Sequence, residues 1–261
     1  MSRVEDAFKN GKAFIPFITC GFPDLETTKE CVLKMAENGA DIIELGIPFS
    51  DPTAEGVVIQ EANEKALAGF VTTDKVFELV SELRKETQVP LVFMTYANVV
   101  FSYGTERFLE RSKAVGIDGI ILPDVPFEEK EEFEPVCDKY DIPLISFVAP
   151  TSHSRIVDIV KEAKGFIYVV SSLGVTGTRS EINTDLSSIV SLIKANTTVP
   201  CAIGFGISGP DQAAKMASIS DGAIVGSAII KLIGQGKDGA PERVGAFVKE
   251  MKNAVKSSES T

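Results

Sequence analysis

Eight short apolar runs, separated by amphipathic stretches, recur along almost the whole 261-residue chain. Most of these runs are rich in β-branched residues and do not alternate strictly between polar and apolar positions. That pattern is typical of parallel strands covered on both faces. The gaps contain helical patterns, so each strand-plus-helix unit has the spacing of a βα repeat. We expect strands at 13–20, 41–46, 91–96, 119–124, 144–150, 166–172, 201–206 and 222–227.

Eight βα units can form either an open doubly wound sheet or a closed barrel. The number of units, the chain length and the lack of a domain break favour closure. We therefore predict an α/β fold, a single (β/α)8 TIM barrel in which residues 1–261 form one domain, with a frayed tail at about 256–261. In such a barrel the active site lies where the C-terminal ends of the strands meet the loops that follow them.

Charge and composition exclude several classes of protein. The formal net charge of −11 opposes binding to nucleic acid or to an anionic membrane surface. The four cysteines have no paired spacing and there is one histidine, which argues against a metal or redox centre. The N-terminus lacks the apolar core of a signal peptide, and no apolar stretch is long enough to span a bilayer. We expect a cytoplasmic protein.

Glycine-bearing turns follow the last three expected strands. Gly174 and Gly177 follow the sixth strand, whereas Gly206 and Gly226 lie where GFGIS and VGSA run straight into helices. Glycine lets backbone N–H groups approach an anion closely, and a helix N-terminus carries a partial positive charge. Any one of these glycines could simply form a tight turn. Three such turns in succession predict a phosphate site, so the ligand is expected to be a phosphorylated small molecule.

Two carboxylates stand out near the second expected strand. Glu44 is the charged residue near the end of an apolar run, where burial is unfavourable unless the carboxyl group is paired or used. Desolvation would raise its pKa toward neutrality, which suits a general acid/base, although a satisfied structural carboxylate is the alternative. Glu55 could fold back toward Glu44 and share acid and base roles, or it could be a solvated loop charge. The expected strands contain no lysine for a Schiff base.

These motifs resemble the tryptophan synthase alpha subunit family. The segment ELGIPFSDPTAEG, which begins at Glu44 and ends at Gly56, is similar to the family signature. FIPFITCGFPD, MTYANVV, LPDVPFEE, VAPTS, VSSLGVTGTR, GFGIS and VGSAII extend the likeness in register over essentially the whole chain. The resemblance implies a lyase of tryptophan biosynthesis that cleaves indole-3-glycerol phosphate into indole and glyceraldehyde-3-phosphate.

The resemblance also implies roles for single residues. Glu44 matches the catalytic glutamate that moves a proton to and from indole C3. Glu55 matches a second catalytic carboxylate, an aspartate in much of the family, which contacts the indole N–H. The residues expected to bind or surround the indole part are Phe17, Met94, Tyr96, Ile121, Tyr168, Thr176 and Phe205, with Thr176 on a closing loop. The expected phosphate-binding residues are Gly177, Gly206, Gly226 and Ser227.

Members of the family assemble with a PLP-dependent beta subunit in a linear αββα heterotetramer, an alpha2beta2 complex. The alpha subunit itself is expected to need no cofactor and no metal. Pro48, Asp51 and Pro126 match positions that face the partner, although each could serve turn geometry alone. Two other readings remain open at this point. One is a different phosphate-binding barrel enzyme of aromatic biosynthesis, and the other is a catalytically impaired barrel that activates a beta subunit allosterically.

Overall fold

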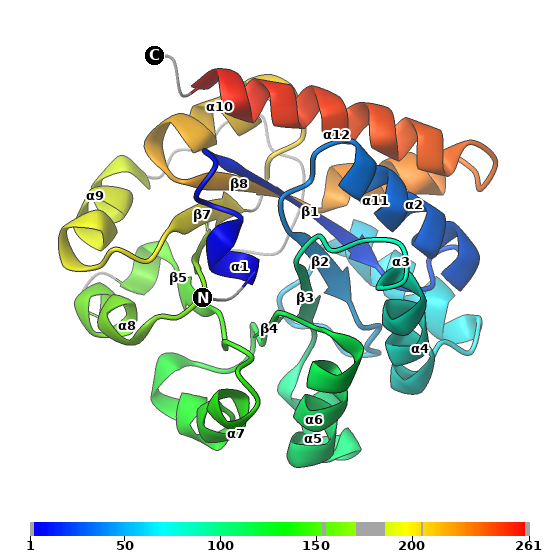
Figure 1. The fold of residues 1–261 in the computed structure, drawn as a ribbon, viewed down its shortest axis with the longest axis horizontal. Helices are drawn as coiled ribbons and strands as arrows, with labels where there is room; N and C mark the ends of the chain where they lie inside the picture. Colours follow the sequence, from blue (N-terminus) through cyan, green and yellow to red (C-terminus); the bar gives the residue numbers. More distant parts are fainter. Residues whose placement is uncertain (1–2, 153–154, 171–185, 205, 259–261) are drawn as a thin grey trace.

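The computed structural model describes residues 3–152, 155–170, 186–204 and 206–258. Within these ranges, parallel strands surround a common centre and helices form an outer layer (Figure 1). All eight expected strands are present, and most end earlier than the apolar run suggested. They are β1 (Ala13–Thr19), β2 (Ile43–Gly46), β3 (Leu91–Met94), β4 (Gly119–Ile121), β5 (Ser146–Val148), β6 (Ile167–Val170), β7 (Cys201–Gly204) and β8 (Gly222–Val225).

The strands follow one another around a barrel. The order of hydrogen-bonded neighbours is β4-β3-β2-β1-β8-β7-β6-β5, and every pair is parallel. The first and last strands pair directly, with Ile15 opposite Ile224, which rules out the open doubly wound sheet. Between β4 and β5 the only ladder contact in the described chain is an isolated bridge, Ile120 to Leu144. The barrel is therefore closed, but this one seam is thin.

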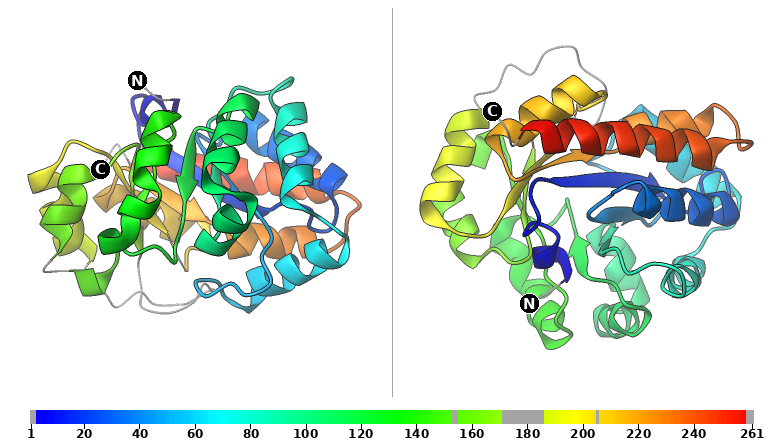
Figure 2. Two further views of the ribbon diagram at one scale, coloured as in Figure 1. Left: turned by 90° about the horizontal axis from the view of Figure 1, so that it is seen from below. Right: turned by 45° about the horizontal axis from the view of Figure 1, so that its top comes forward.

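Helices cover the outside of the barrel. The longest, α12, lies along α2 and α10 (Figure 2). It continues to Ser257, with Val255 buried against the core, so the helix extends past residue 256, where the frayed tail was expected to begin. The helices are α1 (Arg3–Asp6), α2 (Leu25–Glu37), α3 (Val57–Ala68), α4 (Thr73–Leu83), α5 (Ala97–Tyr103), α6 (Thr105–Val115), α7 (Glu134–Lys139), α8 (Ile156–Glu162), α9 (Leu186–Asn196), α10 (Pro210–Ile219), α11 (Ser227–Gly234) and α12 (Ala240–Ser257), with 3-10 turns η1 (Phe127–Glu132) and η2 (Pro150–Ser152).

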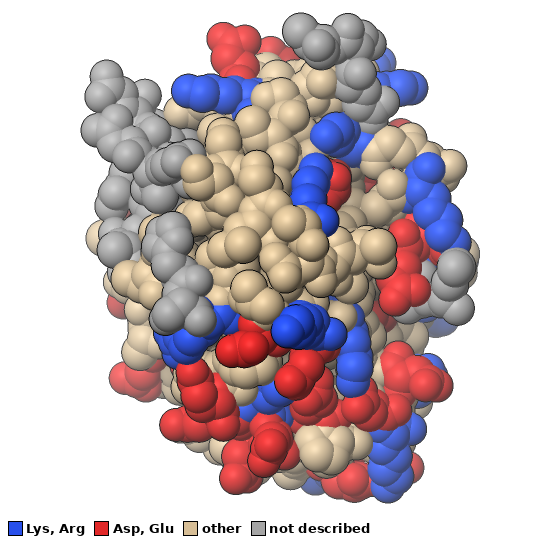
Figure 3. Space-filling view, turned by 90° about the vertical axis from the view of Figure 1, so that its left-hand side faces the viewer, with Lys and Arg blue, Asp and Glu red and all other residues tan. Residues whose placement is uncertain are grey.

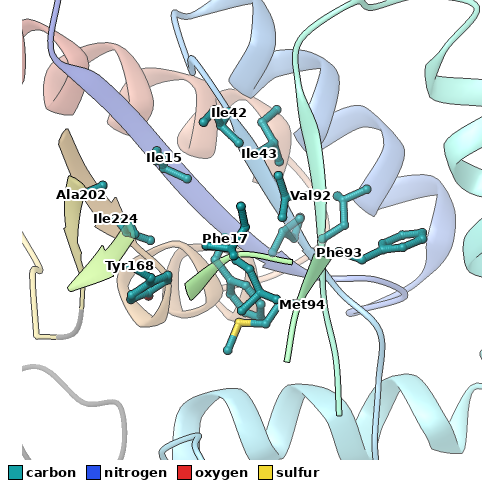
Figure 4. Packing of buried hydrophobic residues seen from close by; sticks show 14 of the residues in the cluster. Ile15, Phe17, Ile42, Ile43, Val92, Phe93, Met94, Tyr168, Ala202 and Ile224 are labelled. Atoms are coloured by element: carbon teal, nitrogen blue, oxygen red, sulfur yellow. The ribbon is translucent and has the colours of Figure 1, made fainter. Parts of the chain in front are cut away.

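Alternate strand residues face the barrel interior and the surrounding helices, so both faces of the sheet are apolar. Ile15, Phe17 and Ile224 lie on the inner side, whereas Phe93 points away from it (Figure 4). Phe93 packs instead against Phe77 of α4, with ring centroids 5.5 Å apart. Burial on both faces explains why the strands lack polar alternation in the sequence.

Three aspartates repeat one contact at the N-terminal ends of the strands. Asp41, Asp118 and Asp221 stand just before β2, β4 and β8, and each exchanges two hydrogen bonds with the first or second residue of the neighbouring strand. The aspartate N–H donates to that residue's carbonyl, and the carboxylate accepts that residue's N–H. The accepted bonds are Phe14 N–H to Asp41 at 2.7 Å, Leu91 N–H to Asp118 at 2.9 Å and Cys201 N–H to Asp221 at 3.0 Å.

Each of these carboxylates also meets a cation from elsewhere in the chain. Asp118 is bound by Arg84 at 2.6 Å and by Arg3 at 2.7 Å. Both guanidinium groups also donate to the carbonyl of Gly116, which ties α1 and α4 to the floor of the barrel. Burial lowers the pKa of Arg84 to about 10, so it remains charged at neutral pH. The hydrogen bonds and ion pairs at this end of the barrel thus stabilise the pairing of the strands.

Acidic and basic side chains lie side by side on the face of the molecule that carries α8 and α9 (Figure 3). Ion pairs such as Lys130–Glu162 and Lys164–Asp138, both 2.5 Å long, join α7 and α8 and their flanking turns. These pairs bring opposite charges into contact on this face. No helix in the described ranges is long and apolar enough to cross a membrane.

Candidate active site

Glu44 lies on β2 inside the barrel, in register with Phe17 of β1 and Val92 of β3. Its side chain is buried, with 1% of the residue exposed. Among the described residues, neither oxygen of its carboxyl group has a hydrogen-bond partner. Burial raises the pKa of Glu44 to about 8. The expected burial and raised pKa are confirmed, and no described residue holds Glu44 as a structural carboxylate, so it is suited to carry a proton near neutral pH.

Tyr168 of β6 enters the same interior from the opposite side of the barrel. Burial raises the pKa of its hydroxyl well above the ordinary value, and the charge of nearby Glu44 raises it further. The ring packs against Phe147, with centroids 4.8 Å apart. A Cβ at position 204 would lie 2.6 Å from the Tyr168 ring, so Gly204 at the end of β7 is needed to make room for it. The tyrosine is therefore held beside Glu44 by packing.

Glu55 is buried as well, with 4% of the residue exposed, so it is not a solvated loop charge. It lies in the loop between β2 and α3. Its Oε2 accepts a hydrogen bond of 2.6 Å from Nδ2 of Asn63, and its backbone carbonyl accepts one of 2.7 Å from Gln60. Burial raises the pKa of Glu55 to about 7, while hydrogen bonds from Asn63 and Tyr96 oppose the rise. The second carboxyl group thus titrates near neutrality, below the first.

Tyr96 connects three of the loops at this end of the barrel. It follows β3, and its hydroxyl accepts the N–H of Ala54 at 3.2 Å in the loop after β2. Its ring stacks on Phe49 of the same loop, with centroids 5.2 Å apart. Asp124, in the loop after β4, accepts the N–H of Ala97 with both oxygens at 3.1 Å and so caps α5 next to Tyr96. These contacts fix the surroundings of Glu55.

Phe17, Met94 and Ile121 are buried near the C-terminal ends of β1, β3 and β4. Met94 is in register with Ile121 on one side and with Gly46 on the other. The Phe17 ring lies over Gly46, where a Cβ would come within 2.7 Å of it. These side chains give the site an apolar floor of the kind that an aromatic ligand requires.

Two of the residues expected to bind phosphate lie at the N-terminus of α11. Gly226 is the residue before the helix and Ser227 is its first residue, and both are half-buried. A Cβ at Gly226 would come within 3.3 Å of the Phe17 ring, so glycine suits this close approach. The first N–H groups of a helix are free of helical partners and can bind an anion. This end of α11 therefore adjoins the apolar floor.

The prediction that GFGIS runs straight into a helix is wrong. Gly206 has a positive φ of 82°, as a turn glycine does, but α10 begins only at Pro210. An extra turn intervenes because the N–H and hydroxyl of Ser208 both donate to Oε1 of Gln212, at 2.8 and 2.9 Å. Gly206 therefore lies in a loop between β7 and α10.

The structure does not describe every residue that was expected at the site. Thr176, Gly177 and Phe205, as well as Gly174, lie outside the described residues. Of the residues expected to face a partner, Asp51 and Pro126 are exposed and Pro48 is buried. In the described ranges no group of histidine, cysteine, aspartate or glutamate side chains could hold a metal ion.

Asn63 and Asp124 were not found from the sequence. Asn63 lies within the pattern of a helix and Asp124 precedes a turn, so neither has a local signal. Their importance depends on the loops of neighbouring βα units being brought together in space.

Comparison with known proteins decides the family. The family model described as "Tryptophan synthase alpha chain" matches residues 4–256. The chain belongs to this family. A tryptophan synthase alpha chain of Lacticaseibacillus casei is 51% identical over 98% of this chain and 96% of its own length. Among solved structures, a tryptophan synthase chain of Mycobacterium tuberculosis has a TM-score of 0.89 at 32% identity, covering 98% of both chains. Tryptophan synthase subunit alpha of Legionella pneumophila has a TM-score of 0.88 at 32% identity, covering 98% of this chain and 99% of that one.

The tryptophan synthase alpha family cleaves indole-3-glycerol phosphate and works with a beta subunit, so this chain is a lyase of that reaction. The resemblance inferred from ELGIPFSDPTAEG is thereby confirmed over nearly the full length. A different barrel enzyme of aromatic biosynthesis is not favoured, and neither is an impaired barrel with a purely regulatory role.

Proposed function

We propose that Glu44 and Glu55 divide the proton chemistry of indole-3-glycerol phosphate cleavage in this chain. The observation that carries the proposal is the burial of both carboxyl groups, one on β2 and one in the loop between β2 and α3, with pKa values raised to about 8 and about 7. Near pH 7.5 the first is mostly protonated and the second mostly ionised. One can then donate a proton while the other stabilises positive charge.

In the proposed reaction, Glu44 gives its proton to indole C3, which turns the indole ring into a protonated indolenine (a 3H-indolium cation). The positive charge that develops at N1 is stabilised by the ionised Glu55. The ionised Glu44 then accepts the proton of the glycerol hydroxyl beside C3, and the bond between C3 and the glycerol carbon breaks. Its electron pair restores the aromatic indole. Indole and glyceraldehyde-3-phosphate leave, and Glu44 is protonated again.

We propose that substrate is held at two ends. The phosphate binds at the N-terminus of α11 through Gly226 and Ser227, with Gly177 and Gly206 completing the cradle. The proposed indole pocket is lined or supported by Phe17, Met94, Tyr96, Ile121, Tyr168, Thr176 and Phe205. The adjacency of Phe17 to Gly226 supports this arrangement, because it places the apolar floor next to the helix terminus.

We further propose that the chain acts in the cytoplasm as part of an alpha2beta2 heterotetramer, without a metal or cofactor of its own. The PLP would belong to the beta subunit. The exposure of Asp51 and Pro126 is consistent with a partner surface near the active site. Because Pro48 is buried, its contribution would be to shape the loop rather than to contact the partner.

The test is indole release from indole-3-glycerol phosphate by the purified chain, with and without a beta subunit. Glu44→Gln should lower kcat by about 10²-fold or more, as expected for loss of a positioned general acid. Glu64→Gln, at an exposed position on α3, is the matched control and should keep full activity. Unchanged turnover in Glu44→Gln would reject Glu44 as the acid. A folded chain that binds the partner but releases no indole would favour the regulatory role.

A further inference from the structure

We propose that Asn63 is a positioning residue for the lyase reaction, which holds the carboxylate of Glu55 in place from helix α3 and keeps it ionised. The inference rests on the proposed function of Glu55. Asn63 acts through Glu55 and does not itself contact the reacting atoms.

Asn63 lies on the inner face of α3, together with Ile59 and Ala66. The face is buried, and only 4% of Asn63 is exposed. Asparagine is a weak helix former, and burying an amide is unfavourable without a strong partner. An aliphatic residue would suit both the helix and the packing better. The presence of asparagine at this position therefore calls for a specific contact.

That contact is the carboxylate of Glu55. Nδ2 of Asn63 is 2.6 Å from Oε2 of Glu55, and both residues are about equally buried. A hydrogen bond to an ionised, buried carboxylate is stronger than one between neutral groups. Asn63 donates, so it favours the ionised form of Glu55, and the direction of its effect on the pKa agrees. The amide is matched to the charge state that the reaction needs.

A glutamate at this position needs such an anchor more than an aspartate would. Its side chain has an additional rotatable bond, so more conformers must be excluded for the carboxylate to stay in one place. Asn63 holds the carboxylate, while Gln60 one turn earlier binds the Glu55 carbonyl at 2.7 Å. Helix α3 thus holds both the backbone and the carboxylate of Glu55, and the carboxylate is also hydrogen-bonded by Tyr96 after β3.

The helix that carries these anchors is itself fixed at the phosphate end of the site. Ile59 of α3 reaches the space beside Gly226, and α3 packs against α11 and β1. Through Asn63, the position of the Glu55 carboxylate is therefore fixed relative to the start of α11. This is the geometry required for one carboxylate to meet a substrate whose phosphate is bound at α11.

The experiment compares Asn63→Leu with Glu55→Gln and with the double variant. Leucine has a similar volume and a better helix propensity, so folding should be preserved. We expect kcat of Asn63→Leu to fall about tenfold with a smaller change in KM. The acid limb of its pH profile should move up by about one unit, as for loss of a hydrogen bond to the charged form.

The control is Asn38→Leu at the C-terminal end of α2, where the amide of the residue that caps the helix donates to the Lys34 carbonyl at 2.8 Å, away from the site. It should lower the melting temperature without moving the pH profile, as a purely structural asparagine would. In the Glu55→Gln background, Asn63→Leu should cause no further loss, because the two residues act as a unit.

The outcomes separate the two claims. If Glu55→Gln is impaired but Asn63→Leu keeps the wild-type pH profile, or still adds a full loss to Glu55→Gln, the positioning role is wrong and that of Glu55 stands. If Glu55→Gln itself is fully active, the proposed function of Glu55 fails and the role of Asn63 fails with it.

Discussion

Glu44→Gln should make the folded chain more stable in alkaline solution while it strongly lowers kcat. The folded state holds Glu44 where its pKa is about 8, compared with an ordinary value of 4.5. A carboxyl group whose pKa is raised by folding favours the folded state least when it is ionised. The contribution of Glu44 to the free energy of unfolding is therefore fully present below about pH 4.5 and is lost progressively as pH rises toward 8. Glutamine does not titrate, so the variant lacks this loss.

The size of the effect follows from the shift. At about 1.4 kcal/mol for each pKa unit, the wild-type chain should lose about 4 kcal/mol of stability between pH 5 and pH 9 through Glu44 alone. Other groups titrate in the same range, but they do so equally in both proteins. The difference between variant and wild type should therefore grow by about this amount in favour of the variant.

Urea unfolding of both proteins at pH 5, 7 and 9, followed by two spectroscopic probes, measures this difference. A direct check is carbon-13 NMR of labelled glutamate side chains, in which one carboxyl resonance should titrate near pH 8 and vanish in Glu44→Gln. A stability difference that does not change with pH, or a resonance that titrates near 4.5, would refute the reasoning from burial.

Three further perturbations probe other parts of the structure. The kcat of the wild-type chain should have a bell-shaped dependence on pH, rising near pH 7 as Glu55 ionises and falling near pH 8 as Glu44 loses its proton. A flat profile between pH 6 and 9 would contradict these assignments. Gly204→Ala should push Tyr168 out of place, reduce activity and cost about 1–3 kcal/mol by overpacking, which a melting curve and an indole assay can check together. Asp118→Asn should cost about 3 kcal/mol by leaving guanidinium groups unpaired at the barrel floor, with kcat unchanged where the protein is folded.

The strands could be predicted from the sequence because their signal is local. A parallel strand covered on both faces must be apolar over several consecutive residues, and each such run was visible. Glu44 was visible for the same reason, since a charge within such a run has no solvent-exposed face to turn to. The strand ends were less well placed, because the apolar run often continues into the loop that lines the site.

What the sequence did not reveal depends on contacts between distant segments. The bond from Asn63 to Glu55, and the cap that Asp124 provides for α5, join different elements of the fold. The paired hydrogen bonds that Asp41, Asp118 and Asp221 make to a neighbouring strand depend on how the strands pair, and in the sequence these residues resemble ordinary turn aspartates. In each case an unremarkable polar residue acquires its role only from the closure of the barrel.

The thin seam between β4 and β5 means that the barrel is closed in topology, although few hydrogen bonds stabilise its closure at this point. Among the described residues, the strands around the barrel are joined by seven ladders and by one isolated bridge, from Ile120 to Leu144. A ring of this kind opens at its weakest joint, so the amides of Ile120 and Ile145 should exchange with solvent earlier than those of β1 and β8. New chain ends placed between β4 and β5 would leave the strong joints intact, and the two halves of the molecule could then assemble along the β1–β8 ladder.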